Sequence, residues 1–249
     1  MGIQRIPEHE LARLREKAKE ITGSQFDYQS SYTELLSRRL NGEPLQYIEE
    51  YVPFYSIQIN VDQRCLIPRP ETEYMIEIIK NNIDMPKKIL DVGTGTGCIA
   101  LMMKKLFPDS EVHAVDISND ALSLAKENAE INNLEVNFYQ SDLLSNVETL
   151  DFDLIVANLP YIPTSTLSTL NKEVIDHEPL IALDGGEDGR LYIDKLQNDL
   201  KNIDSKELVL VLEVDTSHAE SLLSSFTDWE DVKLEKDLVE RDRYIVAKK

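Results

Sequence analysis

The sequence is poor in cysteine, in glycine and in long apolar runs. Cys65 and Cys98 are the only cysteines in 249 residues, which excludes a disulfide framework and favours a reducing compartment, so we expect a cytoplasmic protein. With 9 glycines and 10 prolines the chain is neither collagen-like nor of low complexity. No apolar run approaches the roughly 18 residues of a membrane span, and residues 1–20 contain no apolar signal core. We therefore expect no membrane association.

Positive charge is also scarce. The chain has 26 Lys and Arg residues against 46 Asp and Glu residues, which gives a net charge of −20. Such a chain repels a phosphate backbone, so direct binding to nucleic acid is not expected. The 4 histidines are scattered without metal-ligand spacing, and no metal site is predicted. Because 42% hydrophobic residues are enough for a core, we expect a soluble globular protein. We also expect it to be a monomer.

The N-terminal part of the chain predicts a region distinct from the rest. Apolar residues recur there at three- and four-residue spacing, which indicates amphipathic helices, and two short apolar runs around Tyr55-Ser56 indicate a β-hairpin. We expect helices over 8–21 and 31–40, a hairpin over 51–61, and then a helix over 73–82. The predicted boundary separates an N-terminal region, 1–66, from a main domain, 67–249.

From residue 87 onward, short apolar runs alternate with segments of helical periodicity. This alternation predicts a doubly wound α/β fold with a mostly parallel sheet. The last two strands are joined by a short connection, so we expect them to pair antiparallel at one edge. The expected strands are 87–93, 111–117, 135–142, 151–160, 206–214, 231–237 and 243–249, and the expected helices are 97–106, 119–132, 189–203 and 217–226.

A glycine-rich turn, Asp91-Val92-Gly93-Thr94-Gly95-Thr96-Gly97, joins the first of these strands to its helix. Glycine lets a backbone turn tightly and approach a ligand with no Cβ in the way. Asp91 stands where a carboxylate can face the positively charged amino-acid end of a ligand. Asp116 ends the next strand, where it can accept hydrogen bonds from both hydroxyls of a ribose. These features predict a nucleoside site, although the glycine spacing alone leaves a nicotinamide cofactor open.

The tetrapeptide Asn158-Leu159-Pro160-Tyr161 ends the fourth strand. Ligands of open parallel sheets bind beyond the carboxyl ends of the strands, so we expect Asn158 to lie beside the glycine-rich turn. The Asn158 side-chain oxygen and the Leu159 carbonyl can each accept a hydrogen bond from a planar NH₂ group, against which Tyr161 can place its ring. Held in this way, the nitrogen can direct its lone pair at an electrophile. An ordinary strand-ending turn is the alternative.

The two sites together resemble those of class I S-adenosylmethionine-dependent methyltransferases that act on exocyclic or amide nitrogens. The run Ile67-Pro68-Arg69-Pro70-Glu71-Thr72-Glu73 is similar to a signature of the HemK/PrmC family, the protein-(glutamine-N5) methyltransferases of class I peptide chain release factors. Further similarities, which extend over most of the chain, lie at Gly42–Ile48, Ser141–Leu143, Glu178-Pro179, Gly185–Gly189 and Arg241–Arg243.

The resemblance implies a Rossmann-like fold with a seven-stranded sheet, in which residues 1–66 form a shortened helical region that recognises the substrate. It implies methyl transfer from S-adenosyl-L-methionine, which leaves S-adenosyl-L-homocysteine, to N5 of the glutamine in the Gly-Gly-Gln motif of a release factor. For the cofactor it implies contacts from Asp91, Gly93, Thr94, Gly95, Thr96, Gly97, Asp116, Asp142, Leu143, Asn158, Arg69 and Thr72. For the substrate it implies contacts from Asn158, Leu159, Pro160 and Tyr161, of which Asn158, Pro160 and Tyr161 are the catalytic set.

Three features depart from the family pattern. Leu159 stands where proline is usual, Glu213-Val214-Asp215 stands where the family tends to have a glycine, and the segment before the Ile67–Glu73 run is shorter than the family's N-terminal domain. Three other functions stay open. An N6-adenine methyltransferase of RNA or DNA is disfavoured by the net charge of −20. A non-catalytic cofactor-binding module and a nicotinamide-dependent oxidoreductase each leave one of the two sites unexplained.

Overall fold

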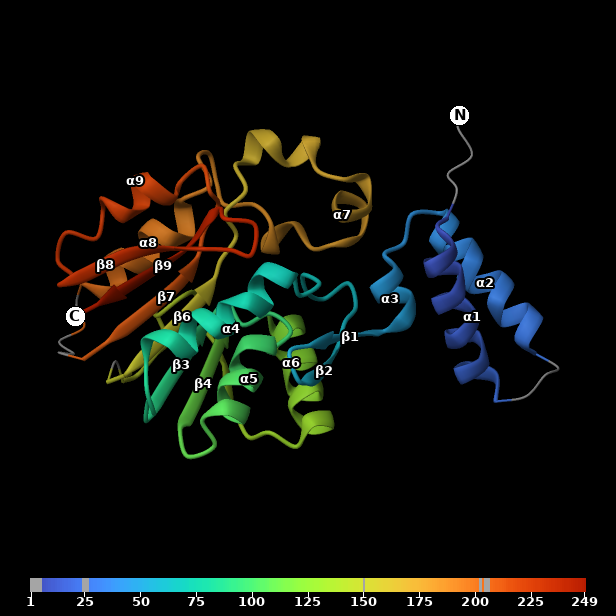
Figure 1. Ribbon diagram of the computed structural model, residues 1–249, viewed down its shortest axis with the longest axis horizontal. Helices are drawn as coiled ribbons and strands as arrows, with labels where there is room; N and C mark the ends of the chain where they lie inside the picture. Colours follow the sequence, from blue (N-terminus) through green and yellow to red (C-terminus); the bar gives the residue numbers. More distant parts are fainter. Residues whose placement is uncertain (1–5, 24–26, 150, 202, 204–206) are drawn as a thin grey trace.

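A seven-stranded β-sheet lies at the centre of the protein, whose structure is a computed structural model that describes residues 6–23, 27–149, 151–201, 203 and 207–249 (Figure 1). The strands lie in the order β5-β4-β3-β6-β7-β9-β8. Neighbours from β5 to β7 are parallel, and β9 runs antiparallel to β7 and β8. This order confirms the predicted doubly wound sheet with its antiparallel edge. The strands are β3 (Lys88–Val92), β4 (Glu111–Asp116), β5 (Asn137–Gln140), β6 (Leu154–Asn158), β7 (Val209–Glu213), β8 (Asp231–Lys236) and β9 (Asp242–Lys248).

Helices cover both faces of the sheet. Successive side chains of a strand point to opposite faces, so each strand contributes to two cores. Ile89 and Val211 pack in one cluster with α4 and α5, whereas Leu90 and Leu210 pack in a second cluster with α8 and α9. Because both faces are buried, the strands are almost continuously apolar. The helices of this part are α4 (Pro70–Asn82), α5 (Cys98–Leu106), α6 (Asn119–Asn132), α8 (Leu191–Leu200) and α9 (Ala219–Leu223).

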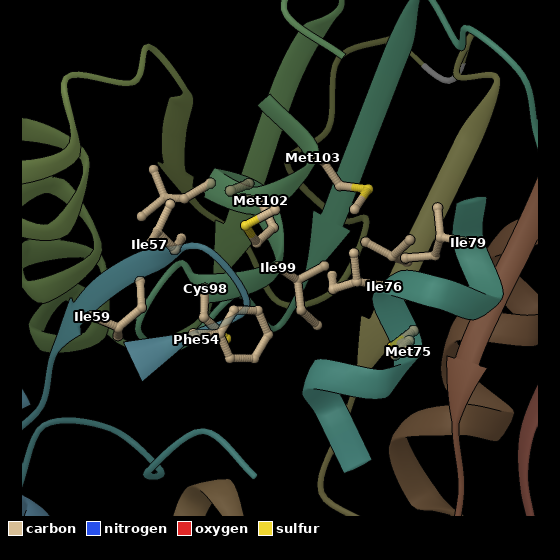
Figure 2. Packing of buried hydrophobic residues seen from close by; sticks show 14 of the residues in the cluster. Phe54, Ile57, Ile59, Met75, Ile76, Ile79, Cys98, Ile99, Met102 and Met103 are labelled. Atoms are coloured by element: carbon tan, nitrogen blue, oxygen red, sulfur yellow. The ribbon is translucent and has the colours of Figure 1, made fainter. Parts of the chain in front are cut away.

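The predicted hairpin forms from β1 (Tyr51–Phe54) and β2 (Ile57–Asn60). Its inward side chains belong to the first sheet core, and Figure 2 shows Phe54 close to Cys98 and Ile99 of α5. The Asn128 side chain of α6 also bonds both backbone groups of Asn60, at 2.7 and 3.0 Å. The hairpin is therefore packed into the core of the sheet, although it precedes residue 67.

The first three helices form a small layer of their own. They share a separate apolar cluster, and Figure 1 shows α1 and α2 beyond α3, away from the sheet. The Arg39 side chain of α2 connects this layer to the rest by an ion pair with Glu173 of α7, at 2.8 Å. These elements are α1 (Glu8–Thr22), α2 (Tyr28–Leu40), α3 (Leu45–Glu49) and α7 (Lys172–His177).

The structure differs from the sequence prediction mainly in its short elements. Helix α4 begins at Pro70 and not at Glu73, because proline fits the first turn of a helix, where its missing N–H leaves no bond unmade. Helix α3 and the segment between β6 and α8 were not predicted, since single turns carry no measurable periodicity. That segment contains η1 (Thr164–Thr169), α7 and η2 (Leu180–Ala182). Residues 202 and 206, at the ends of the expected helix 189–203 and strand 206–214, lie outside the described residues.

Within the described ranges, every helix is too short or too polar to cross a lipid bilayer.

The packing of the hairpin generates a stability prediction. Phe54 is 1% exposed, so Phe54→Ala leaves a cavity and is expected to lower the free energy of unfolding by about 3–5 kcal/mol in urea titrations. Tyr51→Ala, on the outward face of the same strand, is the control and is expected to cost less than about 1 kcal/mol. Equal effects of the two changes would mean that the hairpin does not belong to the core.

Candidate active site

The carboxyl ends of β3, β4 and β6 meet at one edge of the sheet, and a cleft opens there. These strands are neighbours and parallel, so the turn after β3, Asp116 at the end of β4 and Asn158 at the end of β6 lie side by side. The cleft holds about 990 Å³, including the part open to solvent. The predicted site residues that line it are Thr72, Gly93, Thr94, Gly95, Thr96, Asp116, Asp142, Leu143, Asn158, Leu159 and Pro160. Arg69, Asp91, Gly97 and Tyr161 are outside its lining.

The glycine-rich turn leaves room for a ligand at its middle residue. Gly95 has a φ of +54°, a left-handed conformation, and a Cβ built on it would meet nothing within 4 Å. Its N–H donates a hydrogen bond to Asp116 Oδ2 at 2.9 Å. Gly97, by contrast, faces α6, where a Cβ would approach Ala125 Cβ at 3.1 Å. Gly95 therefore leaves space for a ligand in the cleft, whereas Gly97 allows α5 and α6 to pack closely.

Asp91 lies underneath the turn and not in the cleft. Its Oδ2 accepts hydrogen bonds from the Thr94 hydroxyl at 2.6 Å and from the Ala100 N–H at 3.0 Å. Its Oδ1 is buried, and no described residue donates to it. Burial raises the pKa of Asp91 to about 7, against these two hydrogen bonds, which lower it. The carboxyl thus fixes the shape of the turn.

Acidic and apolar groups line the cleft next to the glycine-rich turn. Asp116 accepts a second hydrogen bond from the Ser118 N–H at 2.9 Å, and burial raises its pKa. Leu143 is buried and has a left-handed φ of 51°, which places it in the lining next to Asp142. The Asp142 carboxylate binds Lys195 at 2.8 Å on the exposed side. The Asp116 carboxylate, which can accept hydrogen bonds from hydroxyls, and the apolar side chain of Leu143 therefore line the same cleft.

The Asn158 side chain is held from behind by two buried partners. Its Nδ2 donates to Thr72 Oγ1 at 2.9 Å and to Glu213 Oε2 at 3.0 Å. Thr72 Oγ1 in turn donates to the same Glu213 oxygen at 2.9 Å, and the Tyr161 hydroxyl donates to Glu213 Oε1 at 3.3 Å. Glu213 is 2% exposed, and burial raises its pKa to about 6. Tyr161 thus joins this network through its hydroxyl, and the contact of its ring with a substrate stays a prediction.

Another buried carboxylate, that of Glu178, holds the Ile67–Glu73 run in place. Glu178 accepts hydrogen bonds from Arg69 Nη2 at 2.5 Å and from the Ile67 N–H at 3.1 Å, and its side chain is 1% exposed. Arg69, expected to contact a cofactor, is engaged by this pair. Sequence reasoning missed Glu178 and Glu213 as site residues. The sequence did contain a signal for Glu213, because it is a carboxylate that directly follows the apolar residues 208–212.

The cleft fits a ligand that carries a nucleoside. Asp116 can accept from vicinal hydroxyls, the space over Gly95 admits a chain that approaches the backbone, and Leu143 with Ile117 and Tyr192 offers apolar surface for a flat base. Cys65 and Cys98 also line the cleft, and burial raises the pKa of Cys98 to about 12, so it is a thiol at neutral pH. The described part of the chain has no cluster of side chains that could hold a metal ion.

Comparison with known proteins first defines the class. Residues 70–187 match the family model described as "Methyltransferase small domain". The solved structure of a methyltransferase from Pyrococcus furiosus superposes with a TM-score of 0.60 at 19% identity and covers 87% of this chain and 98% of its own. The fold is that of the class I S-adenosylmethionine-dependent methyltransferases, as the sequence predicted.

Curated relatives define the family within that class. A release factor glutamine methyltransferase from Koribacter versatilis is 38% identical over 226 residues, which are 90% of this chain and 81% of that protein. The protein of the same name from Bacillus cereus is 34% identical over 247 residues, which are 95% of this chain and 85% of that protein. The chain therefore belongs to the release factor glutamine methyltransferase family.

The burial of Asp91 generates a prediction for stability against pH. Its folded-state pKa lies above its unfolded value of 3.8, so the folded protein loses stability as the unfolded chain ionises, with increasing pH from about 4 to about 7. The variant Asp91→Asn does not ionise at this position. As the pH increases from 5 to 8, its free energy of unfolding in urea titrations is therefore expected to increase by about 2–3 kcal/mol relative to that of the unchanged protein. Parallel pH profiles of the two proteins would show that Asp91 is already ionised in the fold.

Proposed function

We propose that the protein transfers the methyl group of S-adenosylmethionine to the side-chain amide nitrogen of the glutamine in the Gly-Gly-Gln motif of a class I peptide chain release factor. The observation that carries this proposal is the side chain of Asn158. Its NH₂ group is used by Thr72 and Glu213, and no described residue bonds its Oδ1, which belongs to a side chain in the cleft lining. An acceptor that faces the cleft suits a substrate that donates an N–H.

Orientation supplies the rate in this proposal. The bound cofactor provides a methyl group on a positively charged sulfur, which is already a strong electrophile. An amide nitrogen is a weak nucleophile because its lone pair is delocalised, and the described cleft lining holds no His or Lys to act as a base. Positioning by Asn158 Oδ1 and the Leu159 carbonyl must therefore lower the barrier, and effective molarities allow about 7–11 kcal/mol for such positioning. Both hydrogen bonds strengthen as the nitrogen gains positive charge, and the methylated nitrogen then releases one of its protons to water.

The cofactor assignment rests on the donors and acceptors of the cleft. Asp116 and the open turn at Gly95 would hold the ribose and the amino-acid end of S-adenosylmethionine, and Asp142 with Leu143 would flank the adenine. Asp91 would act through the shape of the turn, because it lies beneath it. This assignment separates the proposal from a nicotinamide-dependent oxidoreductase, for which the Asn158 acceptor has no use.

Recognition of the release factor is proposed for the N-terminal helices. In this proposal residues 1–66 contain the recognition region and residues 67–249 form the catalytic domain, but the hairpin does not take part in recognition. The hairpin β1–β2 is committed to the sheet core, so α1, α2 and α3 are the elements left to contact a partner. Since release factors act in translation, the proposed enzyme works in the cytoplasm.

Asn158→Ala tests the acceptor role. The change removes a hydrogen bond that forms in the transition state, so kcat for a release factor is expected to decrease at least about 100-fold. The affinity for S-adenosylhomocysteine, measured by calorimetry, is expected to change less than about threefold. Transfer of labelled methyl groups is measured on the release factor, on the same factor with Gln→Glu in its Gly-Gly-Gln motif, and on an adenine-containing oligonucleotide. Label on the oligonucleotide, or equal losses of kcat and affinity, would contradict the proposal.

Asp116→Ala tests the cofactor site. Loss of a carboxylate that bonds hydroxyls is expected to weaken S-adenosylhomocysteine binding at least about tenfold in calorimetry. Asp120→Ala is the matched control, because it removes the same charge at the start of α6 from a side chain outside the cleft lining. If both variants bind equally well, Asp116 does not contact the ligand.

A further inference from the structure

The direction of the hydrogen bonds behind Asn158 is fixed by the chemistry of Glu213. An ionised carboxylate only accepts hydrogen bonds, so the Thr72 hydroxyl must donate its single proton to Glu213 Oε2. The oxygen of that hydroxyl is then left as an acceptor toward Asn158 Nδ2, at 2.9 Å. Both buried partners of Asn158 are therefore acceptors.

This arrangement decides which end of the Asn158 amide faces the cleft. An asparagine side chain can be rotated by half a turn, which exchanges its oxygen and its NH₂ group in nearly the same volume. Rotation here would place Oδ1 against Glu213 Oε2 and Thr72 Oγ1. The single proton of the Thr72 hydroxyl could then bond only one of the two facing oxygens, Asn158 Oδ1 or Glu213 Oε2, in a buried site. The oxygen left without a donor, together with the close approach of Oδ1 to the carboxylate, makes that orientation costly.

We propose that Glu213, acting with Thr72, is a positioning residue that keeps Asn158 Oδ1 turned toward the cleft and thereby selects a substrate that donates an N–H. The inference rests on the proposed function and extends it. A glutamine amide donates through its NH₂ group, whereas a glutamate carboxylate of nearly the same shape only accepts. Glu213 touches neither the substrate nor the cofactor in this scheme, and it acts through Asn158.

The surroundings of Glu213 allow its ionised form to persist at neutral pH. The positive charge of Arg243 and the hydrogen bonds from Thr72 and Tyr161 lower its pKa, whereas burial and the charge of Glu71 raise it. The titratable groups that face it from the neighbouring elements are Tyr161 after β6, Glu71 on α4, Cys98 on α5, and Arg243 and Tyr244 on β9. Burial raises the pKa of Glu213 to about 6, so below that pH its carboxyl gains a proton and can donate.

Kinetics of two variants test the proposal at saturating S-adenosylmethionine. Glu213→Leu removes the acceptor, and its kcat is expected to decrease at least about 100-fold, while S-adenosylhomocysteine affinity changes less than about threefold. Glu213→Gln retains an uncharged acceptor, so its kcat is expected to decrease only about tenfold. The unchanged enzyme is expected to lose its advantage over Glu213→Gln below pH 6, so the ratio of the two kcat values approaches one there. Glu220→Gln on α9 is the control for loss of one negative charge.

A second measurement does not depend on activity. In ¹⁵N-labelled protein, the side-chain NH₂ signal of Asn158, identified by its absence from Asn158→Asp, is expected to exchange slowly with solvent. Glu213→Leu is expected to accelerate that exchange at least about tenfold while thermal unfolding remains cooperative.

The two measurements distinguish failure of the proposed function from failure of the positioning role of Glu213. If the unchanged protein methylates no release factor, the proposed function fails, and the exchange measurement still decides whether Glu213 orients Asn158. If the unchanged protein is active, then full kcat in Glu213→Leu, an acid limb equally deep in Glu213→Gln and in the unchanged enzyme, or unaltered exchange of the Asn158 signal each overturns the positioning role.

Discussion

The parallel register of β4, β3, β6 and β7 is the constraint on which the site depends. Parallel strands end at the same edge of a sheet, so four separate short segments bring their polar residues together without any direct sequence proximity. Asn158 and Glu213 are register partners on β6 and β7, and this pairing puts a carboxylate within hydrogen-bond distance of the amide. The apolar pattern that buries the sheet therefore also assembles the chemistry.

Buried carboxylates organise the cleft walls. Asp91 shapes the glycine-rich turn, Glu178 holds the Ile67–Glu73 run, and Glu213 binds the Asn158 amide. A buried carboxylate is costly unless donors meet it, so each one fixes the positions of the donors that it collects. The net charge of −20 thus includes a few groups with structural roles, while most other acidic side chains are solvated.

Much of the fold could be predicted from the sequence because it depends on local periodicity. The strands of the sheet and helix α6 follow from the spacing of apolar residues. The antiparallel edge follows from the short connection between the last two strands. Helix α3 and the short turns between β6 and α8 could not be predicted, because a single turn has no period and depends on tertiary contacts. The apolar pattern alone predicted helix α1, Glu8–Thr22, with an error of one residue at its C-terminal end, since its apolar spacing is regular.

The sequence predicted most of the residues that line the cleft, but it did not predict the buried residues that hold them in place. Motifs identify residues that converge on a cleft, yet they do not tell which of them face it. The side chains of Tyr161 and Arg69 bond Glu213 and Glu178, and their contacts with a ligand stay predictions. Such partners lie more than fifty positions away in the sequence, and no local pattern connects them.

A crystal structure of the enzyme with S-adenosylhomocysteine and a Gly-Gly-Gln peptide tests the central claim most directly. The account predicts that the glutamine side-chain nitrogen lies about 2.7–3.2 Å from Asn158 Oδ1, with Asn158 Nδ2 still bonded to Glu213. A glutamine bound elsewhere, or an Asn158 that turns its NH₂ group toward the substrate, would contradict it.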